Sequence, residues 1–207
     1  MTRKLLTKPR KVASQTRSRA TVDALLDATA RILVKEGFDK ASTNRIAEVA
    51  GVSVGSLYQY FPGKEALVAA VIERHRQQIT QAVRDELAEV WMQPVEKAIR
   101  GLVAIAVRAH RVDPRLHHVL AEQIPRVGKL EKLETLDREN HALFRTYLEG
   151  CREKLRVDDL ELASFVCVTT IEALTHNAVL HSKMLSDERM DALVDEAAYL
   201  LTRYLKG

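Results

Sequence analysis

The chain has 207 residues, of which 46% are hydrophobic and 29% charged, a composition typical of a globular protein with one large or two small domains. It contains no uncharged apolar run long enough to span a membrane, and its basic N-terminus lacks the apolar segment of a secretion signal. We therefore expect a cytoplasmic protein without a membrane partner. The net charge of +4 is unevenly placed, because residues 1–76 carry 14 Lys and Arg against 7 Asp and Glu. This asymmetry predicts that the N-terminal end meets a polyanion.

Residues 1–19 contain seven Lys and Arg and no acidic residue. Their apolar residues are sparse and Pro9 interrupts them, so we predict a mobile basic arm. Such an arm is either a solvated tail or a segment that contacts the backbone or minor groove of DNA. The sequence leaves both readings open.

A helical pattern begins at about Thr21, where Val22, Leu25, Leu26, Ile32 and Leu33 recur on one face. Gly37 follows the last periodic residue and is a suitable position for the helix to end. We expect this helix to supply the core of a small N-terminal domain.

Two short helices are predicted next. Ser42 or Thr43 can cap the first, and Gly51 can end it in a left-handed conformation. Ser53 can cap the second, whose Leu57 and Phe61 point inward together. Two helices of this length joined by a Gly-containing turn form a helix-turn-helix, which must pack on the preceding helix because such short helices are marginal in water. We assign residues 20–66 to this domain.

The remaining chain, residues 67–207, reads as helical throughout. Pro94 and Ser186 are expected to start helices, and Pro125 is expected to end one. With the three helices above, the predicted segments give an all-α fold of about nine helices; the later ones cover about 64–91, 94–110, 113–123, 129–155, 159–182 and 187–205. The two adjacent histidines His117 and His118 are expected to be solvated.

The second short helix has an outer side that carries no charge. Val54, Gly55, Ser56, Gln59 and Tyr60 lie largely on it. A glycine there permits close approach of a backbone, and a glutamine can read adenine in the major groove. We expect Tyr58 and Tyr60 to lay their rings on the domain and to turn their hydroxyls toward phosphates.

The stretch TNRIAEVAGVSVGSLYQYFPGKEAL, residues 43–67, resembles the DNA-binding domain of tetracycline-repressor (TetR) family regulators almost position for position. The segment from Ala28 to Phe38 is similar too, and the resemblance covers about residues 21–75. Gly63 departs from the pattern, since a better capping residue such as Asn is common there. Gly remains an acceptable cap.

The resemblance implies a homodimeric transcription regulator, usually a repressor, that binds a palindromic double-stranded DNA operator. It implies that Thr43 and Asn44 lie against phosphates and that Tyr58 and Lys64 bind the backbone. Val54, Gly55, Ser56, Gln59 and Tyr60 would lie in or beside the major groove. The family's dimer usually forms through the last two helices, here about 159–182 and 187–205.

The family also places a small-molecule site among the middle helices, and polar residues within apolar stripes are the only pointers to it here. Glu172 and His176 are four residues apart and could pair, either as a structural pair or inside a pocket. The candidate lining residues are Val107, His110, Leu120, Phe144, Tyr147, Phe165, Thr169, Glu172 and His176.

Neither a nucleophile motif nor a Gly-rich phosphate loop is found, so we do not expect an enzyme. The histidines show no metal-ligand spacing, and no metal or cofactor is expected. Two functions remain open. The first is a repressor released from its operator by a ligand. The second is a constitutive DNA-binding or partner-recruiting protein whose C-terminal domain only dimerises.

Overall fold

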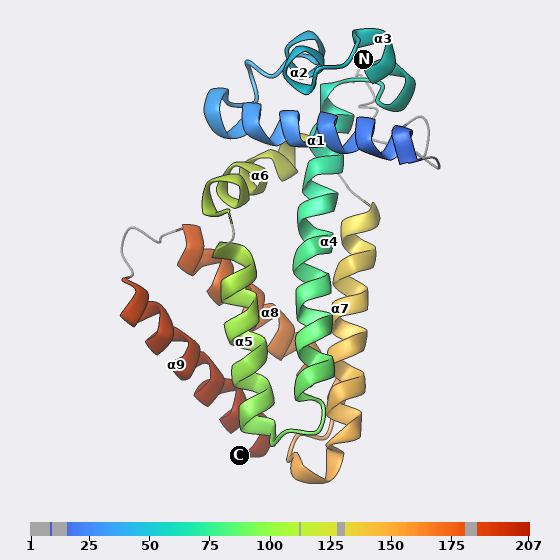
Figure 1. Cartoon of the computed structure of the whole chain (residues 1–207). Coiled ribbons are helices and arrows are strands. Elements are labelled where there is room, and N and C mark those ends of the chain that lie inside the picture. The colour runs from blue at the N-terminus through green and yellow to red at the C-terminus, as the bar shows by residue number, and fades with distance from the viewer. Residues whose placement is uncertain (1–8, 10–15, 112, 128–130, 181–185) are drawn as a thin grey trace, which may run out of the picture. The chain divides into compact units, whose positions relative to one another are not determined.

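The computed structural model describes residues 9, 16–111, 113–127, 131–180 and 186–207, and these residues form nine α-helices, one short 3₁₀ helix and no strand (Figure 1). The predicted all-α fold is therefore confirmed. The chain divides into two compact units, one of residues 1–76 with 115–133 and the other of residues 77–114 with 134–207. None of the helices is long and apolar enough to cross a membrane, as far as the described residues go.

The first unit contains α1 (Thr16–Glu36), α2 (Thr43–Ala50), α3 (Val54–Tyr60) and the first half of α4 (Lys64–Val90). The predicted caps are present. The Ser42 hydroxyl accepts from the Arg45 amide at 3.2 Å, and the Ser53 hydroxyl accepts from the Ser56 amide at 3.0 Å. Gly37 and Gly51 follow α1 and α2 with φ of 82° and 67°. These caps satisfy backbone groups that short helices cannot pair internally.

The core of the first unit is built from the predicted apolar faces. Leu25, Leu33, Ile46 and Leu57 are at most 1% exposed. Thr29 lies on the same stripe, and its hydroxyl donates to the Leu25 carbonyl at 2.7 Å, so its burial leaves no unpaired donor. The helix α1 begins five residues earlier than its apolar pattern indicated. Residues 16–19 of the expected basic arm are thus helical, and most of the rest of that arm lies outside the described residues.

Helix α6 (Pro114–Val127) corrects two expectations. It continues through Pro125, which was expected to end it, and Leu120 and Val127 are both 2% exposed in the core of the first unit. A proline inside a helix costs about 3 kcal/mol. Near the last turn of α6 this cost is offset by the burial of Val127, since burying a valine side chain contributes about 1.5–3 kcal/mol. His117 is not solvated: it is 6% exposed, and its Nδ1 lies 3.1 Å from Nε2 of His75 on α4.

The second unit contains α5 (Val95–Arg111), most of α7 (Glu131–Gly150), α8 (Leu160–Leu180) and α9 (Asp187–Lys206), with the second half of α4. Helix α5 packs against both α8 and α9. The helix expected over 129–155 instead ends at Gly150 and is followed by the 3₁₀ helix Arg152–Lys154. The Asp159 carboxylate caps α8, accepting from the amides of Glu161 and Leu162 at 3.0 and 2.9 Å.

The compact units differ from the predicted domain boundary at residue 66. Ala66, Leu67, Val68, Ala69, Val71 and Ile72 of α4 are at most 1% exposed and belong to the core of the first unit. The first unit also takes in most of α6. A boundary drawn from sequence at the end of the helix-turn-helix motif cannot include α6, since α6 begins only at Pro114 and joins that core from far along the chain.

We predict that Gly51→Ala lowers the free energy of unfolding by about 1–2 kcal/mol, the cost of placing an L-residue in the left-handed region. The surroundings add no clash, since a Cβ at Gly51 would meet nothing within 4 Å. Urea unfolding measures the change. Gly51→Asn is the matched control, because Asn tolerates this conformation better. Equal losses from both variants would contradict the prediction.

Candidate nucleic-acid interface

Helix α3 is positioned by its buried side. Leu57 is completely buried and Phe61, directly after the helix, is 2% exposed, both in the core that α1 and α2 also line. A helix of seven residues has little stability of its own, so these two side chains determine which of its faces is turned outward.

The outer side of α3 carries the predicted groups. Gly55 and Gln59 are exposed, while Val54 and Ser56 are half-buried. The side chains between Val54 and Tyr60 bear no charge, so hydrogen-bonding amide and hydroxyl groups, together with one open backbone position, form this surface. Such a surface suits the edges of base pairs, which present donors, acceptors and methyl groups rather than charges.

Tyr58 and Thr43 are brought together at the edge of this surface. The Tyr58 ring is 40% exposed, and its hydroxyl lies 3.1 Å from the Thr43 hydroxyl. Asn44, the next residue of α2, is exposed. The three predicted phosphate-contacting groups Thr43, Asn44 and Tyr58 therefore lie at or near the start of α2, where unpaired backbone amides also favour an anion.

Tyr60 corrects the sequence-based expectation. It was expected to lie on the outer side of α3, but it is only 8% exposed and belongs to the core of the first unit. Its ring therefore packs in the core of the first unit and is not available to contact a base pair. Successive positions on a helix differ by about 100°, so a seven-residue helix has few outward positions. Tyr58 and Gln59 are exposed, and the next position, Tyr60, is buried.

Lys64 has intramolecular contacts that the sequence did not indicate. Its ammonium group donates to the Phe38 carbonyl at 3.2 Å and lies 4.2 Å from the centre of the Phe38 ring. These contacts attach the start of α4 to the turn after α1. An ammonium group has three donors, so one backbone contact leaves capacity for a phosphate.

Arg45 is a structural residue that motif reading missed. Its guanidinium group donates to Glu48 at 3.0 Å and to Glu36 at 3.4 Å, and these bonds, with Glu48 the larger cause, raise its pKa. The bond to Glu36 joins α2 to the end of α1. Charge spacing could have indicated the pair with Glu48, which is three residues away, but not the one with Glu36.

The residues predicted to line a ligand pocket do not form one set. Val107, His110, Phe144 and Tyr147 are at most 4% exposed in the second unit, whereas Leu120 belongs to the core of the first. Phe165 is 56% exposed and Thr169 is exposed, so these two lie on an outer face of α8, while Glu172 and His176 are half-buried. The predicted set thus divides into a buried group in the second unit, a partly or fully exposed group on α8, and Leu120 in the first unit.

Within the buried group, Tyr147 has a polar atom that is not satisfied. Its ring packs against Trp91 and Phe144, with ring centres 5.9 and 6.0 Å apart, and its buried hydroxyl has no hydrogen-bond partner among the described residues. Burial, and secondarily the Cys151 thiol, raise its pKa. His110, by contrast, bonds the Ala106 carbonyl through Nδ1 at 2.7 Å.

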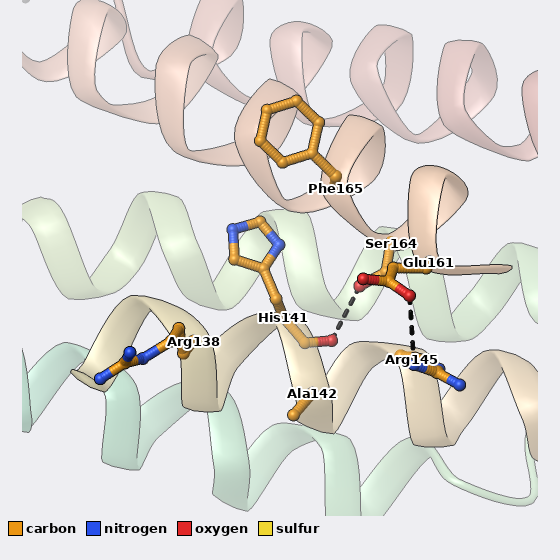
Figure 2. A pocket seen from close by; sticks show the side chains of 7 residues that line it. All are labelled: Arg138, His141, Ala142, Arg145, Glu161, Ser164 and Phe165. Atoms are coloured by element: carbon orange, nitrogen blue, oxygen red, sulfur yellow. Dashed lines mark hydrogen bonds and ion pairs between the residues drawn. The ribbon is translucent and has the colours of Figure 1, made fainter. Parts of the chain in front are cut away.

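A groove of about 310 Å³ lies between α7 and α8 (Figure 2). Of its lining residues only Phe165 had been predicted, and the His141 ring stacks on it with ring centres 5.7 Å apart. Ser164 donates to the His141 carbonyl at 2.8 Å. The lining consists of Arg138, His141, Ala142, Arg145, Glu161, Ser164 and Phe165. Among the described residues, no cluster of three or more His, Cys, Asp and Glu side chains could hold a metal ion.

Comparison with known proteins agrees with this architecture. Residues 25–71 match the model of bacterial regulatory proteins of the tetR family, and residues 94–205 match that of the tetracyclin repressor-like C-terminal domain. The nucleoid occlusion factor SlmA of Haemophilus ducreyi is 32% identical over 206 residues, which is 98% of this chain and 83% of that protein. An uncharacterized HTH-type transcriptional regulator of Mycobacterium tuberculosis is 32% identical over 117 residues, 56% of each chain. The match thus covers little more than half the length of the Mycobacterium tuberculosis regulators.

Solved structures share the fold. A TetR family transcription regulator from Marinobacter aquaeolei superimposes with a TM-score of 0.67 at 20% identity, covering 93% of this chain and 98% of that one. SmeT, the repressor of the Stenotrophomonas maltophilia multidrug efflux pump SmeDEF, gives a TM-score of 0.63 at 21% identity, covering 88% and 91%. With a family model matched over more than half of its length, and a capped helix-turn-helix at the expected residues, the chain belongs to the TetR family of bacterial regulatory proteins.

Proposed function

We propose that this protein is a DNA-binding transcriptional regulator that inserts α3 into the major groove of its operator. The observation that carries the proposal is the division of α3 into a buried apolar side and an uncharged outer side. Gln59 and the open backbone at Gly55 are the groups best suited to reading base edges. Tyr58, Thr43, Asn44 and Lys64 would contact phosphates, which supply most of the affinity and make it sensitive to salt.

The active form is a homodimer joined by the outer faces of α8 and α9. Support comes from large apolar side chains that are exposed there: Leu162, Phe165, Leu200 and Tyr204 are 39–56% exposed. Helix α8 is apolar on nearly all sides, which is characteristic of a helix that is covered on nearly all sides. Two subunits would place their recognition helices about 34–36 Å apart, one turn of a palindromic operator.

The protein acts as a repressor that a small molecule releases from DNA. The buried group around Phe144 and Tyr147 supports an internal site, because a ligand with a hydrogen-bonding group could satisfy the Tyr147 hydroxyl. Helix α4 runs without a break from Lys64 to Val90, from the core of one compact unit into the other. A ligand that prefers one position of α4 would change operator affinity by about 5- to 150-fold, the usual range of allosteric coupling.

A second function is favoured by one comparison. The long match is to SlmA, which is named as a nucleoid occlusion factor and not as a repressor. This name favours the second candidate, a constitutive DNA-binding or partner-recruiting protein whose C-terminal domain only dimerises. The two functions differ in whether any small molecule stabilises the protein and lowers its DNA affinity.

We predict that Gly55→Ala slightly raises the free energy of unfolding but lowers the affinity for operator DNA. A Cβ at this position would meet only the Ser53 hydroxyl, at 3.9 Å. Because Ala in a helix is more stable than Gly by up to about 1 kcal/mol, the free energy of unfolding should rise slightly. Operator affinity should nevertheless fall at least about tenfold, since the methyl group would hold the backbone away from the bases. Urea unfolding and fluorescence anisotropy measure the two effects. Unchanged affinity would remove Gly55 from the interface.

Gln59→Ala should reduce sequence preference, with a loss of about 1–3 kcal/mol of discrimination at one base pair in each half-site. Footprinting on the DNA beside the protein's own gene would locate the operator. Titrations with operator and with scrambled DNA would then give the ratio of the two affinities, which measures sequence preference. Tyr58→Phe is the control, because loss of a phosphate contact weakens binding to both DNAs alike. A Gln59→Ala protein that keeps its preference would refute the assigned reading face.

Tyr147→Phe should leave stability unchanged or raise it, since it removes a buried hydroxyl without a partner. A thermal-shift screen of small molecules should find compounds that stabilise the wild-type protein, lower its operator affinity and act more weakly on the variant. Absence of any stabilising compound would favour the constitutive function. Loss of more than about 1 kcal/mol in the variant would show that the hydroxyl is already satisfied.

A further inference from the structure

The segment that enters the helix-turn-helix is fixed by its own backbone. Gly37 ends α1, and its amide donates to the Leu33 carbonyl at 3.1 Å. Phe38 follows, and its carbonyl accepts from the Ala41 amide at 3.2 Å, one residue before the Ser42 cap of α2. The turn therefore gives the carbonyl and the ring of Phe38 defined positions just ahead of α2.

The segment that leaves the helix-turn-helix is fixed by the core. Phe61 ends α3, with its amide bonded to the Leu57 carbonyl at 2.9 Å, and Lys64 starts α4. Because Phe61 is buried and only Pro62 and Gly63 separate it from Lys64, the start of α4 stays close to the end of α3. Lys64 is thus tied to the exit of the motif as Phe38 is tied to its entry.

Lys64 joins these two segments. Its ammonium group contacts Phe38 twice, since it donates to the carbonyl at 3.2 Å and lies 4.2 Å from the centre of the ring. Both residues are half-buried, which limits the water that competes for the ammonium group. The Phe38 carbonyl accepts from both Ala41 and Lys64, one bond for each of its lone pairs. The contact spans 26 residues of chain and connects the entry of the motif to its exit.

We propose that the contact between Phe38 and Lys64 is a clasp that closes the helix-turn-helix and holds α3 in the orientation that reads DNA. The inference rests on the proposed function, because this orientation matters only if α3 meets DNA. Phe38 is a positioning residue. It is not among the groups assigned to DNA, and it acts through Lys64, which keeps its proposed phosphate contact.

The clasp acts on DNA affinity through the fraction of molecules that are ready to bind. A protein whose binding-competent form is only partly populated loses apparent affinity in proportion to that fraction. Without the ring, the ammonium group keeps only the Phe38 carbonyl, and the start of α4 gains alternative positions relative to the turn before α2. An attraction of ordinary strength between a cation and an aromatic ring corresponds to a change of about two- to fivefold in that fraction.

Three replacements of Phe38 test the clasp by fluorescence anisotropy with operator DNA. Phe38→Leu removes the ring and keeps the carbonyl, so operator affinity should fall about fivefold. Phe38→Tyr keeps a ring that attracts cations and should stay within about twofold of wild type. A trifluorinated phenylalanine at this position keeps the shape of the ring but weakens its negative face, so affinity should fall about threefold. The fluorinated protein decides the test if Phe38→Leu does not fold.

The salt dependence separates positioning from charge. Phe38→Leu should leave the slope of log affinity against log salt concentration unchanged, because Phe38 neutralises no phosphate, whereas Lys64→Met should reduce the slope by about one. With Lys64→Met already present, Phe38→Leu should cost less than about twofold further, since the ring has lost its cation.

Val22→Ala is the control. It removes packing from the same core at the other end of α1, so the free energy of unfolding in urea should fall while operator affinity stays within about twofold of wild type.

The outcomes separate the two proposals. A wild-type protein that prefers no DNA sequence overturns the proposed function and the clasp together. Normal operator binding by the wild type, with no effect of Phe38→Leu and of the fluorinated ring, or with losses that add in the double variant, overturns only the clasp. A loss in Phe38→Leu at unchanged salt slope, retained affinity in Phe38→Tyr and a non-additive double variant support the clasp.

Discussion

The burial of Leu57 and Phe61 beneath α3 is the contact on which the DNA-reading surface depends. A seven-residue helix does not hold its own orientation, so the outer face with Gly55 and Gln59 exists only because the inner face is fixed in a core. The first half of α4 and most of α6 contribute to that same core. The reading face is thus supported by residues as distant in sequence as Leu120 and Val127, and a change in how α6 packs would reach α3 through side-chain contact.

Local signals predicted much of this architecture. Ser42, Ser53 and Ser186 cap the helices that they were expected to cap, and Gly37 and Gly51 end theirs in the left-handed conformation. These features depend on a few consecutive residues, so their patterns are visible in a single sequence. Inward-facing positions such as Leu25 and Leu57 follow from the helical period for the same reason.

The sequence-based expectations that were wrong share another cause, which is packing between segments distant along the chain. Pro125 does not end α6, because Val127 after it is held in the core. His117 is buried against a histidine on α4, and Lys64 is held by the carbonyl and ring of Phe38. Leu120 was grouped with residues of the second unit although it belongs to the core of the first. None of these partners lies within one helical turn, where periodicity or spacing could reveal it.

Tyr60 and Phe165 show how the same limit affects functional assignment. Both are aromatic residues on helices with mixed faces, and the sequence placed Tyr60 outside and Phe165 inside a pocket. In the structure Tyr60 is buried in the core at 8% exposure, whereas Phe165 is 56% exposed and lines the groove between α7 and α8. An aromatic ring suits either a core or an interface, since both remove it from water, and composition alone does not distinguish these destinations. The exposed Phe165 has the greater consequence, because an apolar ring left in water beside the exposed Leu162 forms the kind of surface that a partner usually covers, and this supports the proposed dimer contact.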